Sequence, residues 1–109
     1  MAERTDTENL ILAQQLTGTA VEITVGAASA THGAALAVGR HQLSTNTDCR
    51  VLQGVFGSTT AVATSTMFIK GQIREIVVTA TGVDDGVAAI QDNASGALTI
   101  TPLVTAIPA

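Results

Sequence analysis

The sequence predicts an all-β protein, an antiparallel β-sandwich or jelly-roll-like fold of about seven or eight short strands with extended N- and C-terminal arms. Three observations predict this fold class. Apolar and polar residues alternate with a period of two in several short runs. Gly, Asn, Asp and Ser clusters separate these runs at intervals of roughly eight to twelve residues. No long helical period lies between the runs, which disfavours a parallel sheet with crossover helices.

The clearest signal is the stretch 86–102, which reads GVAAIQDNASGALTITP. Apolar residues alternate in 87–90 and again in 97–101, and the turn-forming run 92–96 separates the two segments. This pattern predicts two strands joined as an antiparallel hairpin with one buried face. Pro102 is predicted to end the second strand.

Earlier stretches of the chain predict further strands. The run 21–25 alternates cleanly, which predicts a strand with one wet face. Ile73 is out of phase with the rest of its stretch, which predicts a bulge near Arg74 and Glu75. The predicted strands cover 19–25, 34–43, 49–56, 66–69 and 72–80.

These strands predict one folded domain with an extension at each end. Residues 1–18 are expected to form an N-terminal arm, residues 19–102 the β-sandwich domain, and residues 103–109 a C-terminal tail. The tail sequence, LVTAIPA, is apolar and reads as an extended segment.

The N-terminal stretch 8–16, ENLILAQQL, leaves two alternatives open. Thr5 and Glu8 stand at capping-box spacing and Gly18 could stop a short helix. The apolar run 10–12 could equally lie extended on a partner.

The composition predicts a core that is thin for the size of the chain. The 109 residues suit one domain, yet Trp and Tyr are absent and the aromatic residues are Phe56 and Phe68. Many apolar positions are Ala, which contributes far less than the ~1.5–3 kcal/mol of a large buried side chain. Hydrophobic residues make up 46% of the chain and charged residues 13%. Apolar, threonine-rich surface is therefore expected to be covered by neighbouring copies or a larger assembly.

Charge and cysteine content exclude several classes of protein. The net charge is −4 and the few cations are scattered, so nucleic-acid binding is not expected. The single Cys49 allows no internal disulfide, fits a reducing cytoplasm, and is expected to be a small buried hydrophobe. No apolar run approaches the ~18–20 residues of a membrane span, and the acidic N-terminus shows no signal peptide.

The chemistry-bearing residues predict no enzyme, cofactor or metal site. His32, His41, Cys49 and Asp48 match no catalytic spacing, and the two histidines are expected at the surface or in an interface. Acidic residues flank the predicted strand 87–91 and are expected to form turns, namely Asp84, Asp85 and Asp92. The phosphate-loop, dinucleotide-binding and zinc-protease motifs are absent from the sequence.

Seven short motifs carry a family resemblance. They are 39–44 (GRHQLS), 48–51 (DCRV) with Gly54, 61–63 (AVA), 67–69 (MFI) with Gly71, 75–78 (EIVV), 87–92 (VAAIQD) and 94–101 (ASGALTIT). Together they resemble small head-decoration, or capsid cement, proteins of tailed phages. The resemblance implies a β-sandwich in the virion, assembled in the host cytoplasm. Such a protein sits on the capsid and bridges subunits of the major capsid protein, commonly as a trimer.

Both chain ends are the expected partner contacts. The residues expected to make these contacts are Asn9, Leu10, Ile11, Leu12, Leu16, Leu103, Val104 and Ile107. Two other functions stay open at this point: a tail, fibre or baseplate component, and a small ligand-binding β-sandwich. The lack of Trp and Tyr argues against sugar stacking in the second of these.

Overall fold

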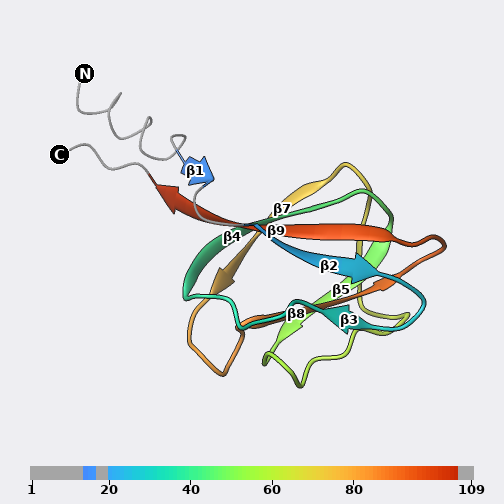
Figure 1. Ribbon diagram of the computed structural model, residues 1–109, viewed down its shortest axis with the longest axis horizontal. Helices are drawn as coiled ribbons and strands as arrows, with labels where there is room; N and C mark the ends of the chain where they lie inside the picture. Colours follow the sequence, from blue (N-terminus) through green and yellow to red (C-terminus); the bar gives the residue numbers. More distant parts are fainter. Residues whose placement is uncertain (1–13, 17–19, 106–109) are drawn as a thin grey trace.

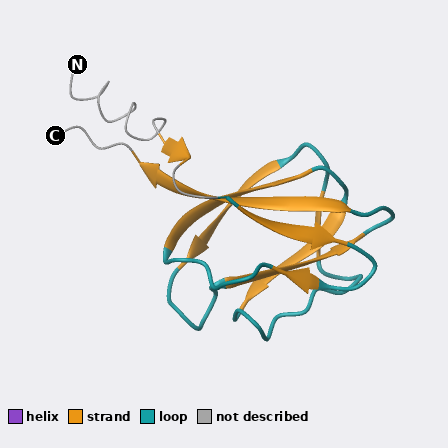
Figure 2. Ribbon diagram, viewed as in Figure 1, coloured by secondary structure: helices purple, strands orange, loops and turns teal. Residues whose placement is uncertain are grey.

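The computed structural model describes residues 14–16 and 20–105 of the chain, and these residues form an antiparallel β-sandwich (Figures 1 and 2). The described residues contain nine strands and no helix, which confirms the predicted all-β class. The strands are β1 (Gln14–Leu16), β2 (Val21–Val25), β3 (Ala30–Thr31), β4 (Gly39–Thr45), β5 (Cys49–Gly54), β6 (Thr66–Phe68), β7 (Ile73–Val78), β8 (Gly86–Gln91) and β9 (Gly96–Thr105).

The strands β2 to β9 pair like one long antiparallel hairpin that is folded over, in which the first strand pairs with the last. β2 pairs with β9, β3 with β8, β4 with β7, and β5 with β6, each pair antiparallel. β4 also pairs with β9, and β5 also pairs with β8, so that the four pairs combine into two sheets. One sheet has the order β2-β9-β4-β7, with β1 beside the far end of β9, and the other has the order β3-β8-β5-β6.

The predicted hairpin over 86–102 is wrong, because its two strands belong to different sheets. β8 lies between β3 and β5, whereas β9 lies between β2 and β4. The turn between them crosses from one sheet to the other, with the Asp92 N–H donating to the Asp48 carbonyl at 3.1 Å. β8 is buried on both faces, since Val87, Ala88 and Ala89 are all 0% exposed. A strand of this kind loses the one-sided pattern that marks a hairpin with a wet face.

Two other local predictions also fail. No bulge interrupts β7, whose register with β4 runs unbroken from Gly39↔Val78 to Ser44↔Ile73. Ile73 breaks the apolar rhythm because it faces solvent, with 68% of its surface exposed. The strand predicted from residue 34 begins at Gly39, and the preceding segment is a loop held by a bond from the Leu36 N–H to the Asp85 carbonyl.

The core lies between the two sheets and consists of the inward alternate residues. The buried apolar residues that pack together are Ile23, Val25, Leu36, Leu43, Cys49, Phe68, Val78, Val87, Ala89, Leu98 and Ile100. Phe68 is the largest fully buried side chain, and Cys49 is 0% exposed, which confirms its prediction as a buried thiol. The alternating run 21–25 also behaves as predicted, because Ile23 and Val25 point into this core.

The loop 55–65 covers part of the outer surface of the β3-β8-β5-β6 sheet. Phe56 stacks on the His32 ring with the ring centroids 5.1 Å apart. The Ala61 N–H donates to Ser29 Oγ at 2.9 Å, and Ala61 is 2% exposed. Ala88 is fully buried although its register partners, Thr31 and Leu52, lie on the outer face of the same sheet.

Candidate functional site

The two chain ends that were expected to contact partners meet in one short ladder, called here the terminal ladder. β1 pairs antiparallel with the end of β9 in the register Gln14↔Thr105, Gln15↔Val104 and Leu16↔Leu103. The ladder projects from one end of the sandwich, where β9 runs away from the sheets and β1 runs back toward them (Figure 1). Residues almost ninety positions apart in the sequence are thereby brought side by side.

Three of the predicted contact residues lie in the terminal ladder: Leu16, Leu103 and Val104. The other five, Asn9, Leu10, Ile11, Leu12 and Ile107, lie outside the described residues. Of the two alternatives for the N-terminal stretch, the part covered by Gln14–Leu16 is a strand. The ladder also contains Gln14, Gln15 and Thr105, which the sequence analysis does not single out because their polar side chains carry no signal for a contact.

Pro102 does not end β9, which corrects the sequence prediction, since the strand continues to Thr105. Both backbone groups of Ala97 face the β4 side of β9. The Ala97 carbonyl accepts from the Asn46 N–H at 3.2 Å, and the Ala97 N–H donates to Asn46 Oδ1 at 2.8 Å. Backbone groups alternate along a strand, so the Pro102 nitrogen points to the opposite side. There it faces the break between β1 and β2, where none of the described residues pairs with it. The missing N–H therefore costs no ladder bond.

Among the residues that the structure describes, the outer end of the terminal ladder has two strands. The last pair between β9 and β4 is Arg40↔Leu103, so Val104 and Thr105 pair with β1 alone. A two-stranded ribbon is marginally stable in water, and its free edges present unpaired backbone groups. An additional strand from a partner can pair with such an edge, and the backbone bonds then supply the affinity.

Apolar side chains continue from the ladder onto the outer face of the five-stranded sheet. Leu103, Arg40 and Val77 form one row across β9, β4 and β7, and Val77 is 52% exposed. The Arg40 guanidinium pairs with Glu75, with Nε 2.6 Å from Oε1. Val38, next to β4, is 59% exposed. The apolar surface expected from the composition is thus present near the ladder.

The histidines are buried, which corrects their expected place at the surface. His32 is 2% exposed, and its Nε2 accepts a bond from the Val87 N–H at 3.0 Å. His41 is 4% exposed, and its Nε2 lies 2.8 Å from the Ala37 carbonyl oxygen. Both rings bond to backbone groups of nearby loops, and neither is bonded to the Cys49 thiol.

Cys49 is placed as a core residue. Burial raises the pKa of its thiol above the ordinary value of 9.0, and the nearby Asp48 charge acts in the same direction. The contact of Sγ with Thr45 Oγ1, 3.8 Å away, opposes the rise. A thiol in this setting holds its proton at neutral pH, unlike the low-pKa thiols that act as nucleophiles.

The acidic residues near β8 serve the turns, as predicted. Asp84 Oδ1 accepts bonds from the N–H groups of Thr79 and Ala80 at 2.9 Å and 3.2 Å. Asp85 accepts from Gly82 and Phe56 at 2.8 Å and 3.0 Å. Among the residues that the structure describes, no group of three His, Cys, Asp or Glu side chains is arranged to hold a metal ion.

Comparison of the chain with protein-family models, with curated proteins and with solved structures found no match. Within the described residues, no helix has the length and apolarity needed to cross a membrane.

Proposed function

We propose that this protein is a non-enzymatic structural component of a tailed-phage virion, of the capsid cement type. It binds the outside of the capsid and stabilises the shell by bridging subunits of the major capsid protein, with copies of the chain associated as a trimer. The family resemblance of the motifs between residues 39 and 101 supports this proposal.

The observation that carries the proposal is the terminal ladder. Its outer end has two strands and no third neighbouring strand within the described residues. An element of this kind gains most of its stability when a partner strand or surface covers it. A sandwich that ends in such a ladder is built to attach to something larger.

The strand order gives independent support. We assign the orders β2-β9-β4-β7 and β3-β8-β5-β6 to a jelly roll, an architecture of two Greek keys that recurs in viral capsid and lectin domains. Because one fold hosts many functions, this assignment supports the proposal less strongly than the ladder does.

Stabilisation would follow from binding linkage. A protein that binds the assembled shell, and not the free coat subunits, shifts the assembly equilibrium toward the shell by mass action. Three linked copies around a local symmetry axis would dissociate far more slowly than one copy, because release requires every contact to open together.

The test uses phage heads assembled without this protein. The heads are mixed with the full chain, with a variant lacking residues 1–16, or with a variant lacking residues 104–109. We expect the full chain to raise the temperature at which the heads release DNA, and both truncations to bind weakly. A variant lacking residues 1–7 is the matched control, because it keeps every residue expected to contact a partner. The unfolding transition of each variant checks that the sandwich is intact.

Bare heads that withstand heat and osmotic shock as well as decorated heads would contradict the proposal. Gold-labelled antibody bound to the tail instead of the head would replace it with a tail, fibre or baseplate role. Specific binding on a glycan array, with no binding to heads, would favour the small ligand-binding module.

A further inference from the structure

A second surface, away from the terminal ladder, combines an arginine with apolar side chains. Arg50 lies on the outer face of β5, in register with Ile90 on β8 and Met67 on β6. Leu52, two residues further along β5, shares this face and is 42% exposed. These four residues are called the Arg50 patch. Arginine and methionine beside aliphatic side chains are typical of the centre of protein interfaces.

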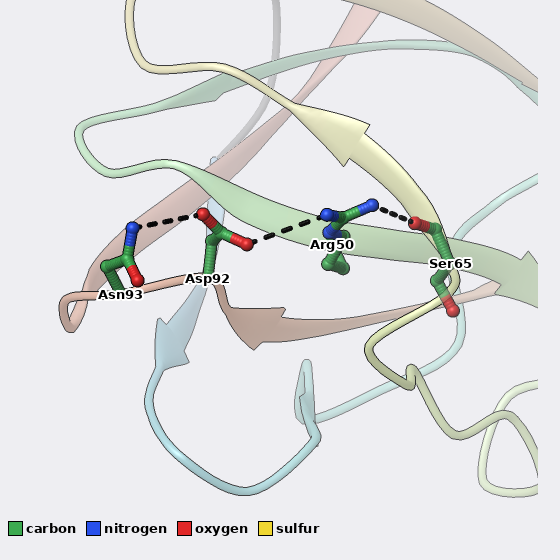
Figure 3. Close-up of polar contacts among 4 residues, drawn as sticks. All are labelled: Arg50, Ser65, Asp92 and Asn93. Atoms are coloured by element: carbon green, nitrogen blue, oxygen red, sulfur yellow. Dashed lines mark hydrogen bonds and ion pairs between the residues drawn. The ribbon is translucent and has the colours of Figure 1, made fainter.

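The Arg50 guanidinium has weak partners within the described chain (Figure 3). Nη1 lies 3.3 Å from the Ser65 carbonyl oxygen, and Nη2 lies 3.6 Å from Asp92 Oδ1. Nε is buried and has no hydrogen-bond partner. The other oxygen of Asp92 accepts a bond from Asn93 Nδ2 at 3.2 Å, so this carboxylate is shared.

A guanidinium carries five N–H donors and binds best to a carboxylate held by two parallel bonds. Two long contacts leave much of that capacity unused, although 70% of the Arg50 side chain is already buried, its exposed fraction being 30%. A partly buried cation with unused donors is stabilised when a second carboxylate approaches its exposed nitrogens. The ligand that fits the patch therefore combines a carboxylate with aliphatic side chains.

The N-terminal stretch of the chain has this chemistry. In 8–12, ENLIL, the side chains of Glu8, Leu10 and Leu12 fall on one side whenever the segment is extended. We infer that the Arg50 patch binds residues 8–12 of a second copy of this chain. Glu8 pairs with Arg50, and the two leucines cover Leu52 and its apolar neighbours. The inference deepens the proposed function, because it names the partner of one terminal segment.

Chain length favours a second copy over the same molecule. From Leu16 to Gln14 the chain runs outward along the terminal ladder, away from the sheets (Figure 1). Arg50 lies toward the other end of the sandwich, just past the turn where Asn46 contacts Ala97. β9 covers about 27 Å between Ala97 and Thr105. The six residues from Gln14 back to Glu8 span at most about 21 Å, and they would first have to reverse direction.

Charge reversal tests the inference without any phage head present. We expect the purified full chain to sediment as an oligomer. Glu8→Arg alone and Arg50→Glu alone should each raise the dissociation constant about tenfold or more, because each places like charges together. An equimolar mixture of the two variants should restore assembly in part, since an arm of one variant meets a patch of opposite charge on the other and two of the three contacts in a mixed trimer are then favourable. The double variant Glu8→Arg/Arg50→Glu should restore all three contacts. Glu3→Arg, which makes the same charge change earlier in the arm, is the matched control.

The outcomes separate the alternatives. Rescue by the double variant, with no gain at all in the mixture over either variant alone, would show that the contact is internal, and it would overturn the inference. So would a monomeric wild-type chain, or normal assembly of the Glu8→Arg variant, whose substitution lies outside the described residues. Head binding by a protein that stays monomeric would refute this contact and leave the cement function standing. Oligomers that depend on the arm but do not bind heads would support this contact and refute the cement function.

Discussion

Two buried hydrogen-bond acceptors, His32 and Asp85, hold the loops of this sandwich against its sheets. Nε2 of His32 accepts from Val87, so the ring proton is on Nδ1, which donates to the Ala34 carbonyl at 2.5 Å. The same ring stacks on Phe56. One side chain therefore joins β8, the loop before β4 and the loop after β5.

Replacing His32 with Phe tests the value of this acceptor. The variant keeps an aromatic ring beside Phe56 but leaves the buried Val87 N–H without a partner. We expect the free energy of unfolding to fall by about 1–3 kcal/mol, measured by urea denaturation. Thr24→Ser, on an exposed face, should change it by less than ~0.5 kcal/mol. Equal stability of wild type and His32→Phe would contradict the expected role.

Acid should weaken the fold through the turn carboxylates. Hydrogen bonds from the N–H groups of Gly82 and then Phe56 hold the pKa of Asp85 below its ordinary value of 3.8. The pKa of Asp84 is also lowered, and the side-chain hydrogen bond from Thr79 is the largest cause. A lowered pKa means that the folded state favours the charged form. The stability that these two charged carboxylates contribute is complete above pH 3.8, and it is lost as the pH falls through their lowered pKa values in the folded state.

Thermal unfolding between about pH 6 and pH 2 measures this effect. We expect the melting temperature of the wild-type protein to fall on the acid side of this range. Asp85→Asn should unfold more easily at neutral pH, and its stability should depend less steeply on acid. A variant that keeps the full acid dependence of the wild type would show that other groups are responsible.

At the level of the strands, β8 depends on a close approach between backbones. A Cβ atom added to Gly86 would lie 2.5 Å from the Phe56 Cα and 2.7 Å from its nitrogen. These backbone atoms are fixed by the bond from the Phe56 N–H to Asp85. The loop 55–65 can therefore lie against the sheet only because residue 86 has no side chain.

Gly86→Ala should accordingly lower the free energy of unfolding by about 1–3 kcal/mol, as overpacking does in general. Gly33→Ala is the matched control, because its added Cβ would meet nothing within 4 Å. Chemical denaturation of both variants provides the comparison. If the Gly33 variant lost as much stability as the Gly86 variant, the loss would not be specific to this contact, because the chain-entropy effect of replacing glycine with alanine is stabilising.

For the molecule as a whole, Phe68 anchors a core that has few large side chains. It is 1% exposed, and the Arg74 guanidinium carbon lies 5.9 Å from its ring centroid. Removing a buried Phe side chain costs about 3–5 kcal/mol, while a small domain is stable by about 5–15 kcal/mol. We expect a measurable fraction of Phe68→Ala molecules to be unfolded at 37 °C. Phe68→Leu should stay folded, with a smaller loss in the free energy of unfolding.

Circular dichroism during urea titration distinguishes these two variants. Ile73→Ala serves as a control, because Ile73 is 68% exposed and its truncation should change stability by no more than ~0.5 kcal/mol. A Phe68→Ala variant that is as stable as the Ile73 control would show that the core does not depend on this ring.

Several features of the structure are local and could be predicted from the sequence. Alternation in 21–25 and 97–101 marks which side chains enter the core, because a strand reverses its side-chain direction at every residue. The acids around β8 were assigned to turns because short carboxylate side chains bond neighbouring backbone N–H groups. Burial of Cys49 is expected because a free cysteine behaves as a small hydrophobe.

Other features depend on residues far apart in the chain. Alternation records which way a side chain points but not which strand lies next to it, so β8 and β9 looked like a hairpin although they joined different sheets. His32 looked like a surface residue because its partner Val87 lies 55 positions away. Pro102 remains within β9 because the break between β1 and β2 falls beside it. Period and turn chemistry act over a few residues, whereas sheet partners are chosen by packing of the whole chain.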